Sequence, residues 1–135
     1  EPSKRGNKMN IYEIETIVRS ETIYNGGFTL FFERSVKSLR SKQPYIVGSG
    51  LHGFKIDSDT LYKGSFATIL EGYIETWKRS ESYYDGFGSW LDPDSGNTYI
   101  DPITVHGNLK YALELAKLRG EKCIWNQETN STIDV

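Results

Sequence analysis

The sequence predicts an α+β domain with an antiparallel or mixed sheet and two helices packed on one face of it. Apolar residues recur at helical spacing between residues 66 and 77 and again after Asn108. The remaining segments hold short runs of β-branched and aromatic residues, separated by glycine, proline and asparagine. A chain of 135 residues suits one core, so we expect residues 9–135 to form a single domain.

In the N-terminal part of the chain, the sequence predicts one strand and leaves one segment undecided between strand and helix. Residues 1–8 are polar, and we expect a flexible tail or a cloning remnant there. Ile11 to Arg19 fits either a first strand or a short helix, because its apolar residues follow neither period regularly. Asn25-Gly26-Gly27 predicts a turn, and the aromatic-rich run Phe28 to Phe32 predicts a strand after it.

A polar segment and two short strands are predicted next. Arg34 to Lys42 is rich in serine and basic residues, which is typical of a loop. Pro44 favours an extended residue before it, and Tyr45 to Val47 is predicted as a strand. We expect Phe54 to Ile56 to be its partner across a glycine-rich hairpin connection.

The clearest periodicity in the chain predicts an α-helix that begins near Ser65. Six apolar side chains follow the spacing i, i+3, i+4, i+7, i+8, i+11 and therefore share one helical stripe: Phe66, Ile69, Leu70, Tyr73, Ile74 and Trp77. An aromatic stripe at this spacing is typical of a core. We therefore expect Trp77 to pack inside the domain.

A hairpin follows this helix. Phe87 to Leu91 and Thr98 to Asp101 are predicted strands, and the turn Asp92 to Asn97 reverses the chain between them. This pairing brings Trp90 close to Tyr99. The turn shares two aspartates with calcium loops, but it lacks the glycine and the glutamate that such loops need, so no metal site is predicted.

A second helix and two strands complete the predicted domain. Asn108 caps the helix, Gly120 ends it, and one face is apolar, formed by Leu109, Ala112, Leu113 and Ala116. Cys123 to Trp125 is predicted as a buried strand. Ser131 to Val135 is predicted as an edge strand, which leaves homodimerisation open.

Charge and cysteine content narrow the classes of function. The chain carries 16 basic and 18 acidic residues without a basic stripe, which argues against nucleic acid as the main partner. No apolar run reaches the roughly 20 residues that span a bilayer, so we expect a soluble protein without a membrane partner. Its single cysteine, Cys123, cannot form an internal disulfide, and a cytoplasmic location is expected.

Residues 48–53 match the pattern G-x-G-x-x-G, through Gly48, Gly50 and Gly53. One interpretation is a loop that cradles the phosphate of a nucleotide. However, a dinucleotide site needs a helix after the third glycine, whereas a strand is predicted there. The other interpretation is a plain connection between strands.

The chain contains two histidines, His52 and His106, each followed by glycine. One interpretation is a catalytic acid and base pair, but no serine or cysteine stands in a nucleophile motif. Another is a zinc site, but two histidine ligands leave such a site incomplete. The alternative is two unrelated loop histidines. No catalytic residue, metal site or cofactor is predicted.

Aromatic residues crowd the segment between the first predicted helix and the hairpin. Tyr83, Tyr84 and Phe87 flank Asp85-Gly86, and Trp90 follows. If some of these rings are exposed, they form a surface for a partner or for base stacking. The alternative is that they cover one end of the core.

One pattern of residues extends through the chain: Gly26-Gly27-Phe28-Thr29-Leu30, Trp90-Leu91-Asp92, Gly96, Tyr99, Asp101, Ala112, Ala116 and Ile124-Trp125. It resembles a pattern found in small uncharacterised proteins of bacteriophages and mobile elements, over residues 26–135, although Asn126 stands where an acidic residue is expected. The resemblance implies a viral or prophage accessory protein, acting in the cytoplasm of a host cell.

Three hypotheses about function follow. The leading one is a small non-enzymatic protein that binds and blocks a host protein through Tyr83, Tyr84, Phe87 and Trp90. The second is a sponge for a small nucleotide, with its phosphate at Gly48, Gly50 and Gly53, its base on a neighbouring aromatic residue, and His52 as a further ligand-binding residue of the same loop. The third is an enzyme that uses His52 and His106 as acid and base.

Overall fold

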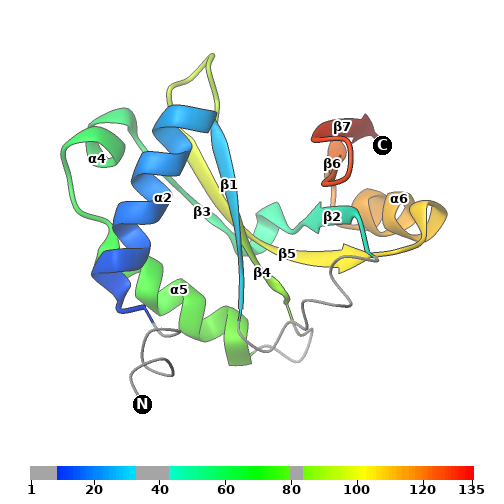
Figure 1. The fold of residues 1–135 in the computed structure, drawn as a ribbon, viewed down its shortest axis with the longest axis horizontal. Coiled ribbons are helices and arrows are strands. Elements are labelled where there is room, and N and C mark those ends of the chain that lie inside the picture. The colour runs from blue at the N-terminus through cyan, green and yellow to red at the C-terminus, as the bar shows by residue number, and fades with distance from the viewer. Residues whose placement is uncertain (1–8, 33–42, 80–83) are drawn as a thin grey trace.

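An antiparallel sheet of seven strands forms the centre of the fold, in the order β1-β4-β5-β2-β6-β7, with β3 also paired to β5 (Figure 1). The structure is a computed structural model that describes residues 9–32, 43–79 and 84–135. The strands are β1 (Gly27–Phe31), β2 (Tyr45–Gly48), β3 (Phe54–Ile56), β4 (Gly86–Leu91), β5 (Thr98–His106), β6 (Cys123–Asn126) and β7 (Ser131–Asp134). The helical elements are α2 (Ile11–Asn25), η1 (Gly50–His52, a 3-10 turn), α4 (Ser58–Tyr62), α5 (Ala67–Arg79) and α6 (Leu109–Leu118). The predicted α+β class with an antiparallel sheet is confirmed, whereas the predicted tail 1–8 and loop 34–42 lie outside the described residues.

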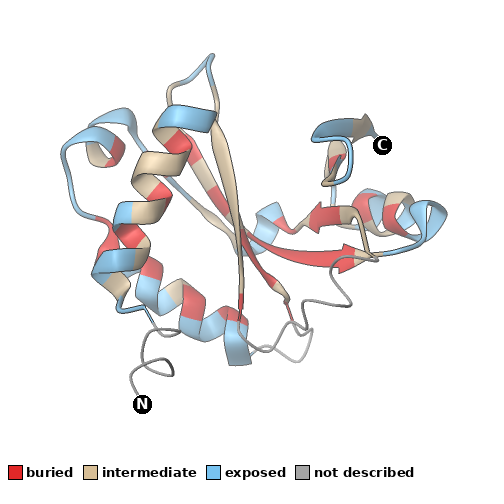
Figure 2. Ribbon diagram, viewed as in Figure 1, coloured by how far each residue is buried: buried red, intermediate tan, exposed pale blue. Residues whose placement is uncertain are grey.

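The helices lie on one face of the sheet. Ile100 of β5 packs in the core cluster that α2 and α5 cover, and Val47 of β2 packs against Ala112 and Ala116 of α6. Val47 pairs with Thr104, which points to the same side of β5 as Ile100 because side chains alternate along a strand. A smaller cluster of Ile46, Ile103 and Val105 lies on the opposite face. Figure 2 shows the buried residues concentrated on β5 and on the inner sides of the helices.

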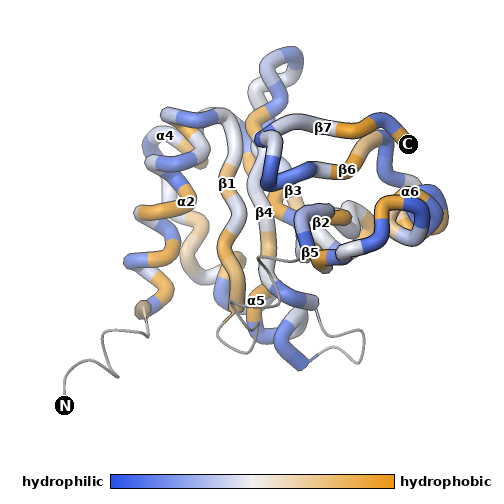
Figure 3. Tube along the Cα trace, turned by 45° about the vertical axis from the view of Figure 1, so that its right-hand side comes forward, coloured by the Kyte–Doolittle hydropathy of each residue, from blue (hydrophilic) through white to orange (hydrophobic). Residues whose placement is uncertain are grey.

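α2 resolves the assignment that the sequence left open. Asn10 caps it by accepting a hydrogen bond from the Glu13 N–H, and the Glu13 side chain accepts one from the Asn10 N–H. Gly26 ends the helix in the left-handed conformation at φ 80°, so the predicted turn is the end of a helix. Hydrophobic and hydrophilic residues alternate along α2 in Figure 3.

Two polar side chains lie on the buried face of α2, and both are hydrogen-bonded. Glu15 Oε2 accepts hydrogen bonds from the Phe66 N–H at 2.6 Å and from the Ser65 hydroxyl at 3.2 Å, where α5 begins. Thr22 Oγ1 lies 2.6 Å from Ser89 Oγ of β4. Because an unsatisfied buried polar group is costly, these contacts fix the position of α2 against α5 and the sheet.

The aromatic stripe of α5 packs largely as predicted. Leu70, Ile74 and Trp77 are buried, and the Trp77 ring centroid lies 5.8 Å from that of Phe87. Ile69 is the exception, because 47% of its surface is exposed. The prediction that it belongs to the core is therefore wrong, and Ile69 stands at the rim of the groove described below.

The predicted hairpin between β2 and β3 is wrong. Both strands pair with the same side of β5, with Gly48 opposite Ile103 and Phe54 opposite Ile100. Residues 49–53 therefore leave the sheet opposite Asp101 and Pro102. The Pro102 carbonyl accepts a hydrogen bond from the Ser49 N–H, so the side of Pro102 that lacks an N–H faces this interruption.

The C-terminal half follows the prediction more closely. In the β4–β5 hairpin Trp90 pairs with Tyr99, and their ring centroids are 6.0 Å apart. Asn108 caps α6 by accepting from the Tyr111 N–H, and β7 is the edge strand. The expected burial of β6 holds only for Ile124, because Cys123 is partly exposed and 38% of Trp125 is exposed on the face away from α6.

Replacement of Glu15 tests the contact that joins α2 to α5. We expect Glu15→Ala to lower the free energy of unfolding by about 1–3 kcal/mol, because the buried Phe66 N–H loses its acceptor. Glu75→Ala, at an exposed position of α5, is the matched control and should change stability by less than about 0.5 kcal/mol. Urea denaturation measures both, and equal effects would contradict the assigned role of Glu15.

Candidate functional site

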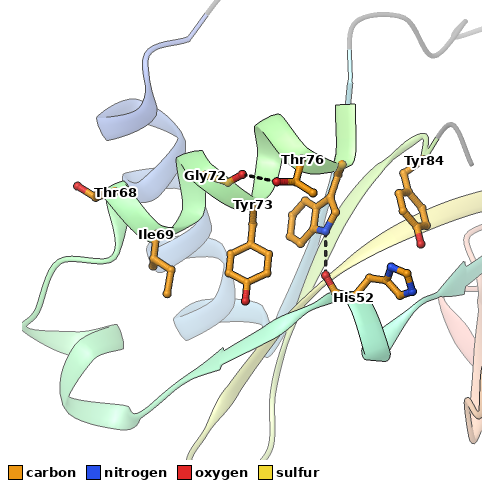
Figure 4. A pocket seen from close by; sticks show the side chains of 8 residues that line it. His52, Thr68, Ile69, Gly72, Tyr73, Thr76 and Tyr84 are labelled. Atoms are coloured by element: carbon orange, nitrogen blue, oxygen red, sulfur yellow. Dashed lines mark hydrogen bonds between the residues drawn. The ribbon is translucent and has the colours of Figure 1, made fainter. Parts of the chain in front are cut away.

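A groove of about 490 Å³ lies between α5 and η1 (Figure 4). α5 forms one wall of the groove. Residues from η1 and from the segment before β4 close one end of it. The residues that line it are Thr68, Ile69, Gly72, Tyr73, Thr76 and Trp77 of α5, together with His52 and Tyr84. Apart from His52, the lining side chains are uncharged, so the groove suits an apolar or aromatic group.

The aromatic walls are held in place by neighbouring groups. The Trp77 Nε1–H donates a hydrogen bond to the His52 carbonyl oxygen at 2.9 Å, which ties η1 to α5. Tyr73 stacks on Phe54 of β3, with 4.5 Å between ring centroids. The groove therefore needs little rearrangement of its side chains to accept a ligand.

Two residues predicted for separate reasons meet at one end of the groove. His52 and Tyr84 have ring centroids 6.2 Å apart, and the Tyr84 hydroxyl lies 3.3 Å from Ser49 Oγ. Figure 4 shows His52 below α5 and Tyr84 beyond the end of this helix. The expectation that the ring of Tyr84 is exposed is nevertheless wrong, because only 4% of its surface is accessible.

Arg119 lies on the other side of Tyr84 and was not singled out as a site residue from the sequence. Its Cζ is 5.9 Å from the centre of the Tyr84 ring. Its Nη1 donates to Thr104 Oγ1 at 2.9 Å and to the Val47 carbonyl oxygen at 3.1 Å. Burial lowers the pKa of Arg119, while Tyr84 and Glu121 act in the opposite direction. A guanidinium nevertheless stays charged in proteins.

His106 belongs to the Arg119 side and does not line the groove. Its Nε2 is 2.8 Å from Thr104 Oγ1, and its ring lies 5.2 Å from that of Tyr111. Burial and the Arg119 charge lower the pKa of His106, against a smaller opposite effect of Asp85. The two histidines thus contact different residues, and this geometry lends no support to their use as a catalytic pair.

Carboxylates line the glycine-rich loop. The Gly50 N–H donates to Glu121 Oε2 at 3.1 Å, and a Cβ on Gly53 would overlap Asp101 Oδ1 and the Ile100 carbonyl oxygen. Burial, followed by the Glu121 charge, raises the pKa of Asp101 to about 6. A phosphate at this loop would meet two acidic side chains and an N–H that is already bonded, so the loop chemistry opposes anions.

The other predicted site residues do not join the groove. Phe87 is fully buried next to Trp77, so its expected exposure is wrong. Trp90 is 55% exposed, but its register with Tyr99 places it on the sheet face opposite the helices. Tyr83 lies outside the described residues.

The described residues form neither a metal site nor a membrane-spanning helix. No group of three or more histidine, cysteine, aspartate or glutamate side chains there is arranged to hold a metal ion. In the same part of the chain, every helix is too short or too polar to cross a bilayer. Comparison of the sequence and the structure with protein-family models, curated proteins and solved structures gave no match.

The pH dependence of stability tests the environment of Asp101. Because its pKa is raised from 3.8 to about 6, the folded state binds the proton more tightly than the unfolded state does. The contribution of protonated Asp101 to the free energy of unfolding is therefore complete below about pH 4. This contribution is lost as the pH rises through about 6. We expect Asp101→Asn to be more stable than the wild type at pH 7.5, by about 1–2 kcal/mol after allowance for solvent screening. Denaturation from pH 4 to 8 measures this, with the exposed Asp94→Asn as control; a parallel pH profile for Asp101→Asn and the wild type would contradict it.

A pair of glycine variants tests the close packing of the loop. Gly53→Ala should destabilise the protein by about 1–3 kcal/mol, because the new methyl group overlaps the Ile100 backbone. Gly72→Ala on α5 meets nothing within 4 Å and should stabilise the helix by about 1 kcal/mol. Thermal unfolding distinguishes them, and a neutral Gly53→Ala would show that the loop is looser than described.

Proposed function

We propose that this is a non-enzymatic binding protein that captures an apolar or aromatic side chain of a partner protein in the groove between α5 and η1. The observation that supports the proposal is the set of aromatic walls, held by the Trp77–His52 hydrogen bond and by the stacking of Tyr73 on Phe54. A volume of about 490 Å³ accommodates one large side chain with neighbouring backbone.

The exposure of the rim supports a protein partner. Ile69 leaves 47% of its surface in water, and Tyr73 is only partly buried. A docked ring would remove this apolar surface from water, and apolar burial is the main favourable term in protein association. Aromatic anchors that fill such grooves are typical hot spots of interfaces.

The side chains around the groove favour binding over catalysis. His52 is the one histidine among the residues that line the groove, and its ring contacts the ring of Tyr84. The third hypothesis, in which His52 and His106 act as acid and base, needs both rings within hydrogen-bond reach of one substrate, and His106 does not line the groove. An arrangement with one histidine among aromatic rings is better suited to recognition.

We place this binding activity in a viral or prophage accessory protein that blocks a protein of its host. The support is a resemblance to small phage proteins at Trp90, Tyr99, Ala112 and Ala116. These residues are packing positions of the hairpin and of α6. A groove that takes one anchoring side chain fits this role, because occupation of a partner surface is enough to inhibit it. No chemical step is then required.

An NMR titration with N-acetyl-phenylalaninamide tests the groove. We expect the largest shifts at the Trp77 indole N–H and at His52, which join the two walls. Ile69→Glu places a charge at the apolar rim and should weaken binding about tenfold or more. Leu118→Glu, at an exposed position of α6, is the control and should leave binding unchanged. Shifts centred on Trp90 and Tyr99 instead would contradict the assignment of the groove.

A further inference from the structure

The guanidinium of Arg119 is partly buried without an acidic partner. Within residues 9–32, 43–79 and 84–135, no carboxylate oxygen lies within 4.0 Å of it. The nearby carboxylate of Glu121 is instead bonded to the Gly50 N–H. Because a charge removed from water is costly unless it is paired, an unpaired guanidinium in this position calls for an explanation.

The hydrogen bonds of Arg119 occupy only one of its three nitrogens. Nη1 donates to the carbonyl oxygens of Val47 and Gly48 and to Thr104 Oγ1. Nε and Nη2 have no acceptor among the residues that the structure describes. These two nitrogens form the edge of a guanidinium that binds a carboxylate through two parallel hydrogen bonds. The bonds at Nη1 therefore hold the side chain in place and leave its bidentate edge available.

Tyr84 connects this edge to the groove. Its ring lies 6.2 Å from His52, which lines the groove, and 5.9 Å from Arg119 Cζ. Tyr84 itself also lines the groove (Figure 4). Tyr84 therefore lies between the groove and the guanidinium, and these two contacts place Arg119 Cζ at most about 12 Å from the His52 ring.

We propose that Arg119 binds the carboxylate of an aspartate or glutamate that stands close to the anchoring aromatic residue in the partner protein. The inference rests on the proposed function, because it names the second group that the groove ligand carries. In an extended peptide, residues two apart point to the same side and are separated by about 7 Å. Because the two side chains add their own length to this separation, an aromatic residue followed two positions later by an acidic one can reach from the groove to Arg119.

The opposing charge of Glu121 limits the gain without cancelling it. Glu121 lies close enough to Arg119 to influence its pKa, and it would repel an incoming carboxylate. However, its Oε2 accepts a hydrogen bond from Gly50, and two direct bonds to Nε and Nη2 act at much shorter range. The arrangement predicts a preference for an acidic ligand that weakens as salt is added.

Two blocked peptides test this inference, acetyl-Phe-Ala-Glu-amide and acetyl-Phe-Ala-Gln-amide. We expect the wild type to bind the glutamate peptide about five- to tenfold more tightly than the glutamine peptide at low salt. Arg119→Gln and Arg119→Lys should each reduce this ratio to less than about twofold while they retain the glutamine peptide. The lysine variant keeps the charge but loses the bidentate edge, and it remains informative if Arg119→Gln fails to fold.

The outcomes separate the inference from the proposed function. Equal binding of both peptides by the wild type would overturn the role of Arg119 and leave the groove standing. Binding of neither peptide would overturn the proposed function itself. Arg119-dependent binding of phenyl phosphate, together with equal binding of the two peptides, would also overturn the inference, because the ligand would then be a small anion. A preference for the glutamate peptide that persists in both Arg119 variants would also overturn the inference, because another cation of the protein would then bind the carboxylate.

Discussion

The interruption of the sheet beside β5 is the constraint on which the rest of the structure depends. β2 and β3 both pair with this strand, but Pro102 offers no N–H toward them, and residues 49–53 leave the sheet at that point. The displaced turn η1 is then held from two sides, by Trp77 at the His52 carbonyl and by Glu121 at the Gly50 N–H. Without this break His52 would be a strand residue, and the groove beside α5 would lose one of its ends.

Local patterns in the sequence predicted the elements that depend on local contacts. The stripe of α5, the β4–β5 hairpin and the cap of α6 follow from spacing and turn chemistry, and the structure confirms them except for the exposed Ile69. The sequence of α2 does not distinguish a helix from a strand, because the buried face of the helix includes Glu15 and Thr22, which interrupt the apolar periodicity. The pairing of β3 was wrong because neighbouring strands in sequence usually pair, and only Pro102 signalled that these two would not.

In the candidate site, too, the sequence indicates single residues, whereas the contacts between distant segments could not be predicted from it. His52 and Tyr84 were named from separate motifs, and their contact arises from the interruption of the sheet, which no local motif encodes. From the sequence, Arg119 is only a positive charge at the end of α6, because the carbonyl oxygens that accept its hydrogen bonds come from the distant strand β2. Trp90 is close to Tyr84 in sequence, but Tyr84 precedes β4 and packs in the core cluster beside α5, whereas the pairing of Trp90 with Tyr99 places Trp90 on the opposite face of the sheet.

Soaking crystals of the protein in phenol tests the central claim most directly, because a small neutral ring reports where the surface accepts an aromatic group. The account predicts phenol between Ile69, Tyr73 and Tyr84, with η1 still bonded to Trp77. Phenol bound at Trp90 and Tyr99, with only water in the groove, would contradict it.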